Sequence, residues 1–354
     1  MAASYQSRFL GVMRYTEQAM KRLFSTLAAQ VAREVTRRAS PDGTVPRSAI
    51  ADIQDAVSPL VTRMFLGRDR QGSRAPFVVM ANGLVFPLSP YAAILLKQEE
   101  KAVTISVEQQ AAIMHEHLRN APDVLAVLQT ARRNPFPQRV SEQFRPNPLA
   151  QYDPPHTWVD PRGYTLSERI WSTAGNTRRR LDLFLEQRIA AGDGALRISR
   201  DVETFLLPGR RLIRTSAPYG TDASYDAMRL MRTEITRAAA QASEAAAAMN
   251  PFVRGLSVVL SASHPKYDIC DRAAAHGPWP LDDMPDWAKI PLHPHCLCHY
   301  QYEMVDNQQE ILDELRDDVR AGRRATSLVG PLQVAQFVRL LLGGVSLVRG
   351  ELRL

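Results

Sequence analysis

Apolar side chains in residues 1–40 recur every three or four positions, as they do on one face of an α-helix. The recurring residues are Phe9, Met13, Met20, Phe24, Ala28 and Val31. This spacing predicts an amphipathic helix over 5–38 with a basic outer face. We expect it to end at the turn sequence SPDG, residues 40–43, and a second helix to follow over 47–65.

Two short apolar runs in the stretch FVVMANGLVFPLS flank Asn82 and Gly83. Asn-Gly between apolar runs is a strong hairpin signal, because both residues readily adopt positive φ. Helical spacing returns over 107–133. The segment 134–161 then holds seven of the 24 prolines. Proline lacks an amide donor and restricts its predecessor, so this segment is predicted to be a linker.

Helical patterns resume after the linker. Thr165 and Glu168 have the spacing of a capping box, which satisfies backbone amides at a helix start. The apolar positions predict a helix from there to about residue 192, a second ending at 207–209, and an alanine-rich third over 225–249.

The pattern then becomes strand-like. Alternation predicts a strand over 256–261, a loop over 264–295, a second strand from residue 296, and a charged helix over 307–324. One face of the second strand would carry Cys296, Cys298, Tyr300 and Tyr302.

These elements predict an α+β fold, with a mostly helical N-terminal region and a helix-rich C-terminal domain that holds a small β-sheet. The expected divisions are a helical region with a hairpin (1–133), the linker (134–161), the C-terminal domain (162–305) and a helical tail (306–354).

The composition is that of an ordinary globular protein, with 45% hydrophobic and 23% charged residues. We find neither a signal peptide nor an uncharged apolar run long enough to cross a membrane, and we expect a chain that stays in a cytoplasm without structural disulfides.

The net charge of +7 is concentrated near the start of the chain, where residues 1–40 hold seven Lys and Arg against two acids. Such a field attracts acidic partners or nucleic acid non-specifically. Arg33, Arg37 and Arg38 are the candidate contacts to DNA or to another partner.

Cysteine and histidine are strongly clustered. All three cysteines and five of the eight histidines lie between His264 and His299, partly in the stretch HPHCLCHY. Zinc prefers four thiolate or imidazole ligands in a tetrahedron, and Cys-x-Cys on a strand points both sulfurs to one side. The sequence therefore predicts a structural zinc site that staples the long loop.

The predicted ligands are Cys270, His293, Cys296 and Cys298, and His264 or Asp268 could replace one of them. Two alternatives remain open: the cysteines are simply buried small side chains beside surface histidines, or they carry redox chemistry. We read Asp268 and Asp271 as solvated loop acids.

Several motifs of the second half occur together in one family. DPRGYTLSERIW, FLLPGRR, YGTDASYDAMRLMRTEITRA, SASHPKYDICD and HPHCLC stand in the order found in the Mu F-like head morphogenesis (minor capsid) proteins of tailed bacteriophages. The chain resembles that family over about 158–305. The family's RTE motif corresponds to Arg232, Thr233 and Glu234. We call the segment 264–298, which carries the predicted ligands, the metal loop. Because Arg232 and Glu234 are two positions apart on a helix, we expect one of them to reach the metal loop and the other to face solvent.

The sequence departs from the family at one position. Many members carry two upstream cysteines in a C-x-x-C, whereas here Tyr267 stands in place of the first and only Cys270 remains. This departure favours His264 or His293 as the substitute ligand.

The resemblance implies a non-enzymatic minor head protein inside the capsid near the portal vertex, assembled in the host cytoplasm. Its implied partners are the portal protein or the major capsid protein. Non-specific contact with phage DNA is a separate expectation, which rests on the basic charge described above. Two alternatives are a zinc-stapled nuclease of the HNH kind and a DNA-binding protein ejected with the genome.

Overall fold

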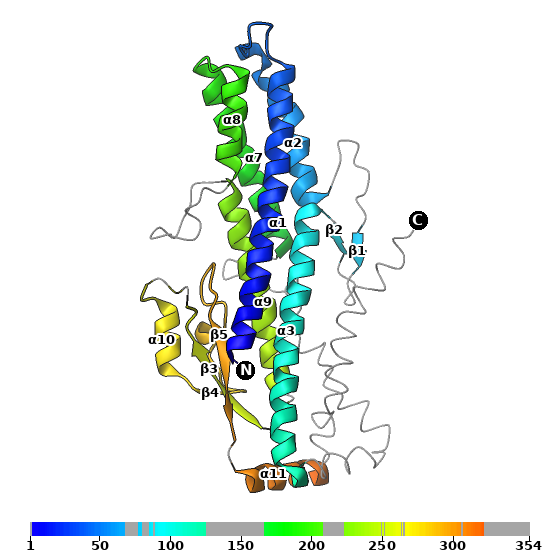
Figure 1. Ribbon diagram of the computed structural model, residues 1–354, viewed down its shortest axis with the longest axis vertical. Helices are drawn as coiled ribbons and strands as arrows, with labels where there is room; N and C mark the ends of the chain where they lie inside the picture. Colours follow the sequence, from blue (N-terminus) through cyan, green and yellow to red (C-terminus); the bar gives the residue numbers. More distant parts are fainter. Residues whose placement is uncertain are drawn as a thin grey trace. The chain divides into compact units, whose positions relative to one another are not determined.

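The computed structural model (Figure 1) describes residues 2–67, 77–79, 85–87, 89–124, 166–207 and 223–321, without residues 249, 251, 263, 265 and 306. These residues form a helix-rich α+β structure with a small three-stranded antiparallel sheet, which confirms the predicted fold class. The proline-rich linker, the hairpin turn at Asn82 and Gly83, and the chain beyond residue 321 lie outside the described residues.

The chain divides into two compact units. The helical unit comprises 12–98 and 156–232, and the sheet unit comprises 1–11, 99–155 and 233–354. Each unit therefore combines sequence from before and after the proline-rich segment, while the divisions expected along the sequence stay a prediction.

The first helix, α1 (Ala2–Arg37), follows the predicted apolar repeat, and Met20, Phe24 and Val31 on that face are buried. The predicted turn ends it. The amide of Gly43 donates to the Ser40 carbonyl at 2.8 Å, and Gly43 has a φ of 82°, a conformation that costs glycine little.

The helical unit is held together by packing between α2 (Ile50–Leu66) and α7 (Leu166–Ala190), with α8 (Ala195–Leu206) after a glycine turn. A short 3-10 turn, Arg47–Ala49, precedes α2. The buried residues include Ile53, Val57, Leu181, Leu185, Ile198 and Val202. The predicted hairpin is present as the antiparallel strands β1 (Phe77–Val79) and β2 (Val85–Pro87).

Helix α3 (Pro90–Asn120) begins well before the predicted start at residue 107. The Ser89 hydroxyl accepts the Ala92 amide at 3.0 Å, which is a side-chain cap on the first turn. Proline is favoured at the first helical position, where its missing N–H costs nothing. The pair Ser-Pro was thus a start signal, and Tyr91 and Leu95 of the added turns are buried.

The sheet unit places the antiparallel strands in the order β4 (Trp279–Pro280), β3 (Val253–Val259) and β5 (His299–Met304). The alanine-rich helix α9 (Ala223–Ala248) contributes Ala240 and Ala247 to the core that includes the strands. Helix α11 (Gln308–Ala321) follows β5, as predicted.

The loop predicted over 264–295 is wrong in part, because it contains helix α10 (Ile269–His276), strand β4 and a 3-10 turn at Asp286–Ala288. In Figure 1, α10 lies beside the sheet, and it contacts β3. The second strand begins at His299 and not at residue 296. The four residues expected on one face, Cys296, Cys298, Tyr300 and Tyr302, are nevertheless all buried.

Gly255 gives the sheet a specific steric test. A Cβ added at Gly255 would lie 2.5 Å from the Trp279 carbonyl oxygen on β4, whereas one added at Gly175, exposed on α7, meets nothing within 4 Å. We expect Gly255→Ala to destabilise the fold by about 1–3 kcal/mol, because backbone must shift. The control Gly175→Ala should instead stabilise by about 0.5–1 kcal/mol, since alanine favours the helix. Urea unfolding of both variants measures this, and equal stability of the two would contradict the β3–β4 pairing.

Candidate metal centre

Cys270 is positioned by the start of helix α10. The Asp268 carboxylate accepts the Cys270 amide at 2.7 Å, and the Asp271 carboxylate accepts the Asp268 amide at 2.7 Å. This reciprocal pair is a capping box. The two acids that we read as solvated loop residues thus define a helix end, and they fix the backbone that carries the Cys270 thiol.

Cys296 and Cys298 come from the loop that leads into β5, and helix α9 holds this loop. The His295 amide donates to the Thr233 hydroxyl at 3.2 Å, and the Thr236 hydroxyl donates to the Cys296 carbonyl at 2.9 Å. His295 has a φ of 65°, an uncommon conformation for a residue other than glycine. The two threonines, one helical turn apart, therefore maintain a turn that the sequence of the loop alone does not favour.

The three thiols converge in the core. Cys270, Cys296 and Cys298 are all buried, and their sulfur atoms lie within 4.8 Å of one another. The Cys270 and Cys296 Sγ atoms are 3.7 Å apart. A disulfide requires about 2.05 Å. Two thiolates on a tetrahedral zinc ion, each at about 2.3 Å, would stand about 3.8 Å apart. The observed spacing fits shared coordination of a metal and does not fit a disulfide.

The thiols cannot easily ionise together. Hydrogen bonds from Cys270 and Cys298 lower the pKa of the Cys296 thiol, and the hydrogen bond to Cys296 raises the pKa of Cys270. Proton sharing of this kind stabilises one negative charge among three sulfurs. A second and third thiolate would repel the first in a buried site unless a cation balanced them.

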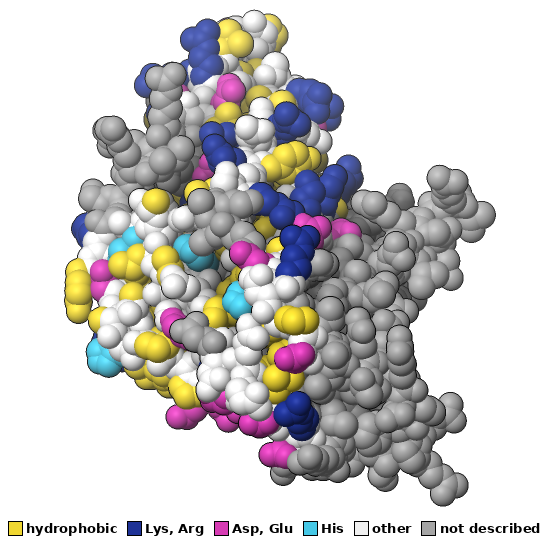
Figure 2. Space-filling view, turned by 60° about the horizontal axis from the view of Figure 1, so that its bottom comes forward, with side chains coloured by type: hydrophobic (Ala, Val, Ile, Leu, Met, Phe, Trp, Pro, Cys, Tyr) yellow, Lys and Arg dark blue, Asp and Glu magenta, His cyan; other side chains and the backbone are white. Residues whose placement is uncertain are grey.

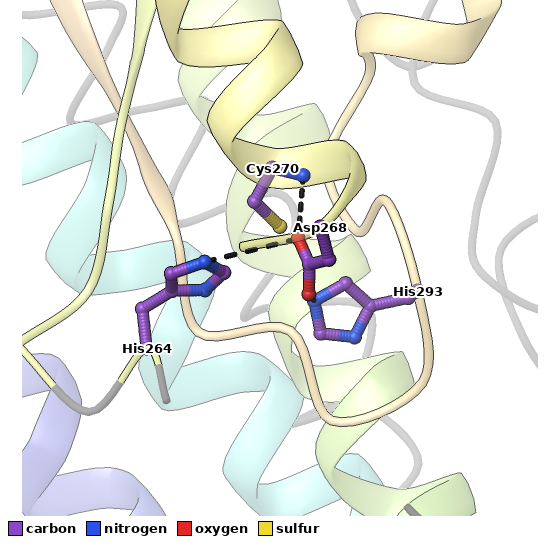
Figure 3. A group of neighbouring side chains, drawn as sticks. All are labelled: His264, Asp268, Cys270 and His293. Atoms are coloured by element: carbon purple, nitrogen blue, oxygen red, sulfur yellow. Dashed lines mark hydrogen bonds and ion pairs between the residues drawn. The ribbon is translucent and has the colours of Figure 1, made fainter. Parts of the chain in front are cut away.

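A polar group adjoins the sulfurs and shares Cys270 with them. Donor atoms of His264, Asp268, Cys270 and His293 also lie within 4.8 Å of one another. Figure 3 shows the Asp268 carboxylate between the two imidazole rings. Its Oδ2 is 3.3 Å from His293 Nε2 and its Oδ1 is 3.8 Å from His264 Nε2. All five ligands predicted from the sequence are thus within this pair of groups.

The two histidines differ in which ring nitrogen faces an acceptor. His293 Nδ1 lies 2.8 Å from the Pro294 carbonyl oxygen. A carbonyl only accepts, so Nδ1–H is the donor to Pro294, and Nε2 is the ring nitrogen that faces Asp268. A metal-bound histidine commonly donates its other ring N–H to a carbonyl or carboxylate in this way. His264 Nε2 lies 2.8 Å from Asp271 Oδ2, which leaves only its Nδ1 for a metal.

Three other histidines of the cluster lie outside both donor groups. His276 is exposed, and its ring Nδ1 donates to the Arg272 carbonyl at 2.8 Å. His299 stands beside the ring of Tyr5, and burial lowers its pKa, so the neutral imidazole is favoured there. His295 contributes its backbone amide to the turn, as described above.

The expectation that one of Arg232 and Glu234 faces solvent is wrong. Neither faces solvent: Arg232 forms a largely buried ion pair with Glu17 of α1, and Glu234 is fully buried, 3.4 Å from Arg237. Thr233 and Thr236 of α9 both bond the backbone of the metal loop. The periodicity of the alanine-rich helix gave no sign of this, because both hydroxyls act on backbone atoms far along the chain.

A second contact joins α9 to the strand that follows the cysteines. The Tyr300 hydroxyl donates to the Glu244 carboxylate at 2.7 Å and accepts the Ile290 amide at 2.8 Å. Burial is the largest influence on Glu244 and raises its pKa. This pair was not foreseen, although an inward tyrosine in a strand needs a partner for its hydroxyl.

Comparisons with protein-family models, with curated proteins and with solved structures found no match to this chain. Among the described helices, none combines the length and the apolar character that crossing a bilayer requires.

Thr236 offers a test of how the loop is held. In Thr236→Val the shape is kept but the donor to the Cys296 carbonyl is lost, and a buried carbonyl without its partner costs about 1–3 kcal/mol. We expect the midpoint of urea unfolding to fall accordingly. Thr204→Val is the matched control, because Thr204 is exposed on α8 and bonds only within its own helix. A Thr236 variant as stable as the Thr204 variant would show that α9 does not secure the loop.

Proposed function

We propose that this chain is a minor capsid protein of a tailed bacteriophage, with a structural role in head assembly near the portal, and that zinc stabilises its sheet unit. The observation that carries the proposal is the contact between two motifs of the family resemblance. Thr233 of the RTE motif accepts the amide of His295 in the HPHCLC motif, 62 residues away. Two motifs that contact each other in the folded chain support the family resemblance more strongly than either motif does alone.

Zinc is proposed because of the donor set. Three thiols and an imidazole are the soft and borderline ligands that zinc takes in structural sites. We assign the ligands Cys270, Cys296, Cys298 and His293. His293 is preferred to His264 because its Nδ1 bonds the Pro294 carbonyl and its Nε2 faces the donor group, whereas His264 Nε2 is engaged by Asp271. With four protein ligands no position remains open for substrate, so the ion would be structural and not catalytic.

The ion would join two segments that the chain brings together from a distance. Cys270 belongs to the first turn of α10, and Cys296 and Cys298 precede β5. Zinc binding adds its free energy to folding, because the unfolded chain lacks the assembled site. The charge of the ion would also balance the thiolates that otherwise repel one another.

Zinc content and ligand identity can be tested together. We expect the purified full chain to retain about one zinc per chain after dialysis, measured by elemental analysis. His293→Ala should lose zinc to a chelator far more readily, and the melting temperature should fall with it. His264→Ala should weaken retention less, by about 10–100-fold in affinity, as partners around a metal site do. His276→Ala is the control and should match the parent chain.

Two results would overturn parts of this assignment. Loss of zinc in His264→Ala but not in His293→Ala would exchange the two histidines and leave the zinc site standing. A parent chain without bound metal, whose melting temperature is also unchanged when all three cysteines are replaced by serine, would refute the zinc site.

The proposed place of the protein can be tested in particles. We expect mass spectrometry of purified heads from the phage that encodes this chain to detect it at a small fraction of the copies of the coat protein. Chemical cross-linking should join it to the portal protein in preference to coat subunits. Absence from both immature and mature heads would contradict the proposal, whatever the metal content of the isolated chain.

A further inference from the structure

On one exposed face of α1, every charged side chain is a cation. Between residues 14 and 33, the exposed positions recur at helical intervals and include Arg14, Lys21, Arg22 and Arg33. At about 100° per residue, these four side chains fall within roughly a third of the helix circumference. We call this the cationic face of α1. The other exposed residues on it are Tyr15, Gln18, Ser25, Thr26 and Ala29, with no acid among them.

The four cations have no ion-pair partner among the described residues. The two acids of α1 are both engaged elsewhere: Glu17 pairs with Arg232, and Glu34 pairs with Arg37 and Arg38. Of the three arginines predicted from the sequence as DNA or partner contacts, Arg33 therefore keeps a free charge, whereas Arg37 and Arg38 share a carboxylate.

The surroundings reinforce the charge of this face. In the described part of the helical unit, Lys and Arg outnumber Asp and Glu, whereas in the sheet unit the acids outnumber the bases. Figure 2 shows Lys and Arg side chains gathered close together on part of the face in view, with few acidic side chains between them. A concentration of one sign creates a local potential that attracts polyanions.

We infer that the cationic face of α1 binds the phosphate backbone of double-stranded nucleic acid without reading its sequence. From Arg14 to Arg33 the helix rises about 28 Å, at about 1.5 Å per residue. A duplex presents one phosphate per about 1.7 Å of its axis, so each cation finds a phosphate within reach. Arginine suits this partner, because its planar guanidinium can bind two phosphate oxygens at once.

The composition of the face favours nucleic acid over an acidic protein. Protein interfaces are built around buried aromatic and aliphatic side chains. Here Tyr15 is the one large ring, 44% exposed, and Ala29 is the one aliphatic residue on the face. Gln18 and Ser25 add polar groups of the kind that commonly bond phosphate oxygens. The inference rests neither on the metal centre nor on the proposed place in a phage head.

Salt dependence of binding tests this inference. Fluorescence anisotropy with the full chain and a labelled 30-base-pair duplex of arbitrary sequence gives the affinity between 50 and 200 mM NaCl. Each phosphate contact adds about 0.9 to the slope of log affinity against log salt. We expect Lys21→Gln with Arg22→Gln to lower that slope by about 1.8 and to weaken binding equally for unrelated sequences.

The matched control removes the same charge from the same unit, but from other helices than α1. Arg63 on α2 and Arg200 on α8 are exposed and have no ion-pair partner among the described residues, so Arg63→Gln with Arg200→Gln serves. Equal losses in the two double variants would refute a specific face and indicate general attraction by net charge. Binding of polyglutamate as tight as that of the duplex would assign the face to an acidic protein instead. Circular dichroism confirms that each variant is folded.

Discussion

Three thiols that meet in a buried site impose a constraint on the rest of the sheet unit. A buried site disfavours several negative charges close together, so these sulfurs either share protons or share a cation. Their meeting depends on two segments far apart in sequence, the capped start of α10 and the turn before β5. The Asp268 cap fixes the first of these segments and the Thr236 hydroxyl fixes the second, and together they hold the sulfurs close to one another.

Helix α9 is the element on which most of these contacts converge. Its buried alanines let the strands approach closely, its threonines bind the metal loop, and Glu244 satisfies the Tyr300 hydroxyl. Small side chains permit close packing, while the few polar ones supply directed hydrogen bonds. The alanine-rich composition of the helix explains its close packing, but it does not predict which hydrogen bonds its polar side chains make.

Much of the fold followed from local pattern. The helices α1, α2 and α9 lie where the residue pattern placed them, and α11 lies where a charge-rich run was predicted to be helical. Asn82-Gly83 marked the hairpin. In each case neighbouring residues determine the structure. The start of α3 and the whole of α10 were missed. Their signals were single capping residues, Ser89 and Asp268, which are easily taken for loop residues when no long apolar repeat follows.

The sequence predicted which residues form the candidate site, but it did not predict how their side chains contact one another. Chemical identity and clustering were enough to select Cys270, Cys296, Cys298, His264 and His293. The ranking of the two histidines depends on the contact of His293 Nδ1 with the Pro294 carbonyl and of His264 Nε2 with Asp271. The spacing of residues along the sequence does not predict contacts of this kind.

The left-handed conformation of His295 bears on how far the turn before β5 depends on the proposed metal. Backbone of this kind carries an energetic cost for a residue with a side chain, and here the hydroxyl of Thr233 helps to offset it. Because hydrogen bonds from helix α9 hold that bend, the turn before β5 has a support that no metal needs to supply. The proposed zinc ion would replace thiol protons beside a turn whose backbone helix α9 already supports.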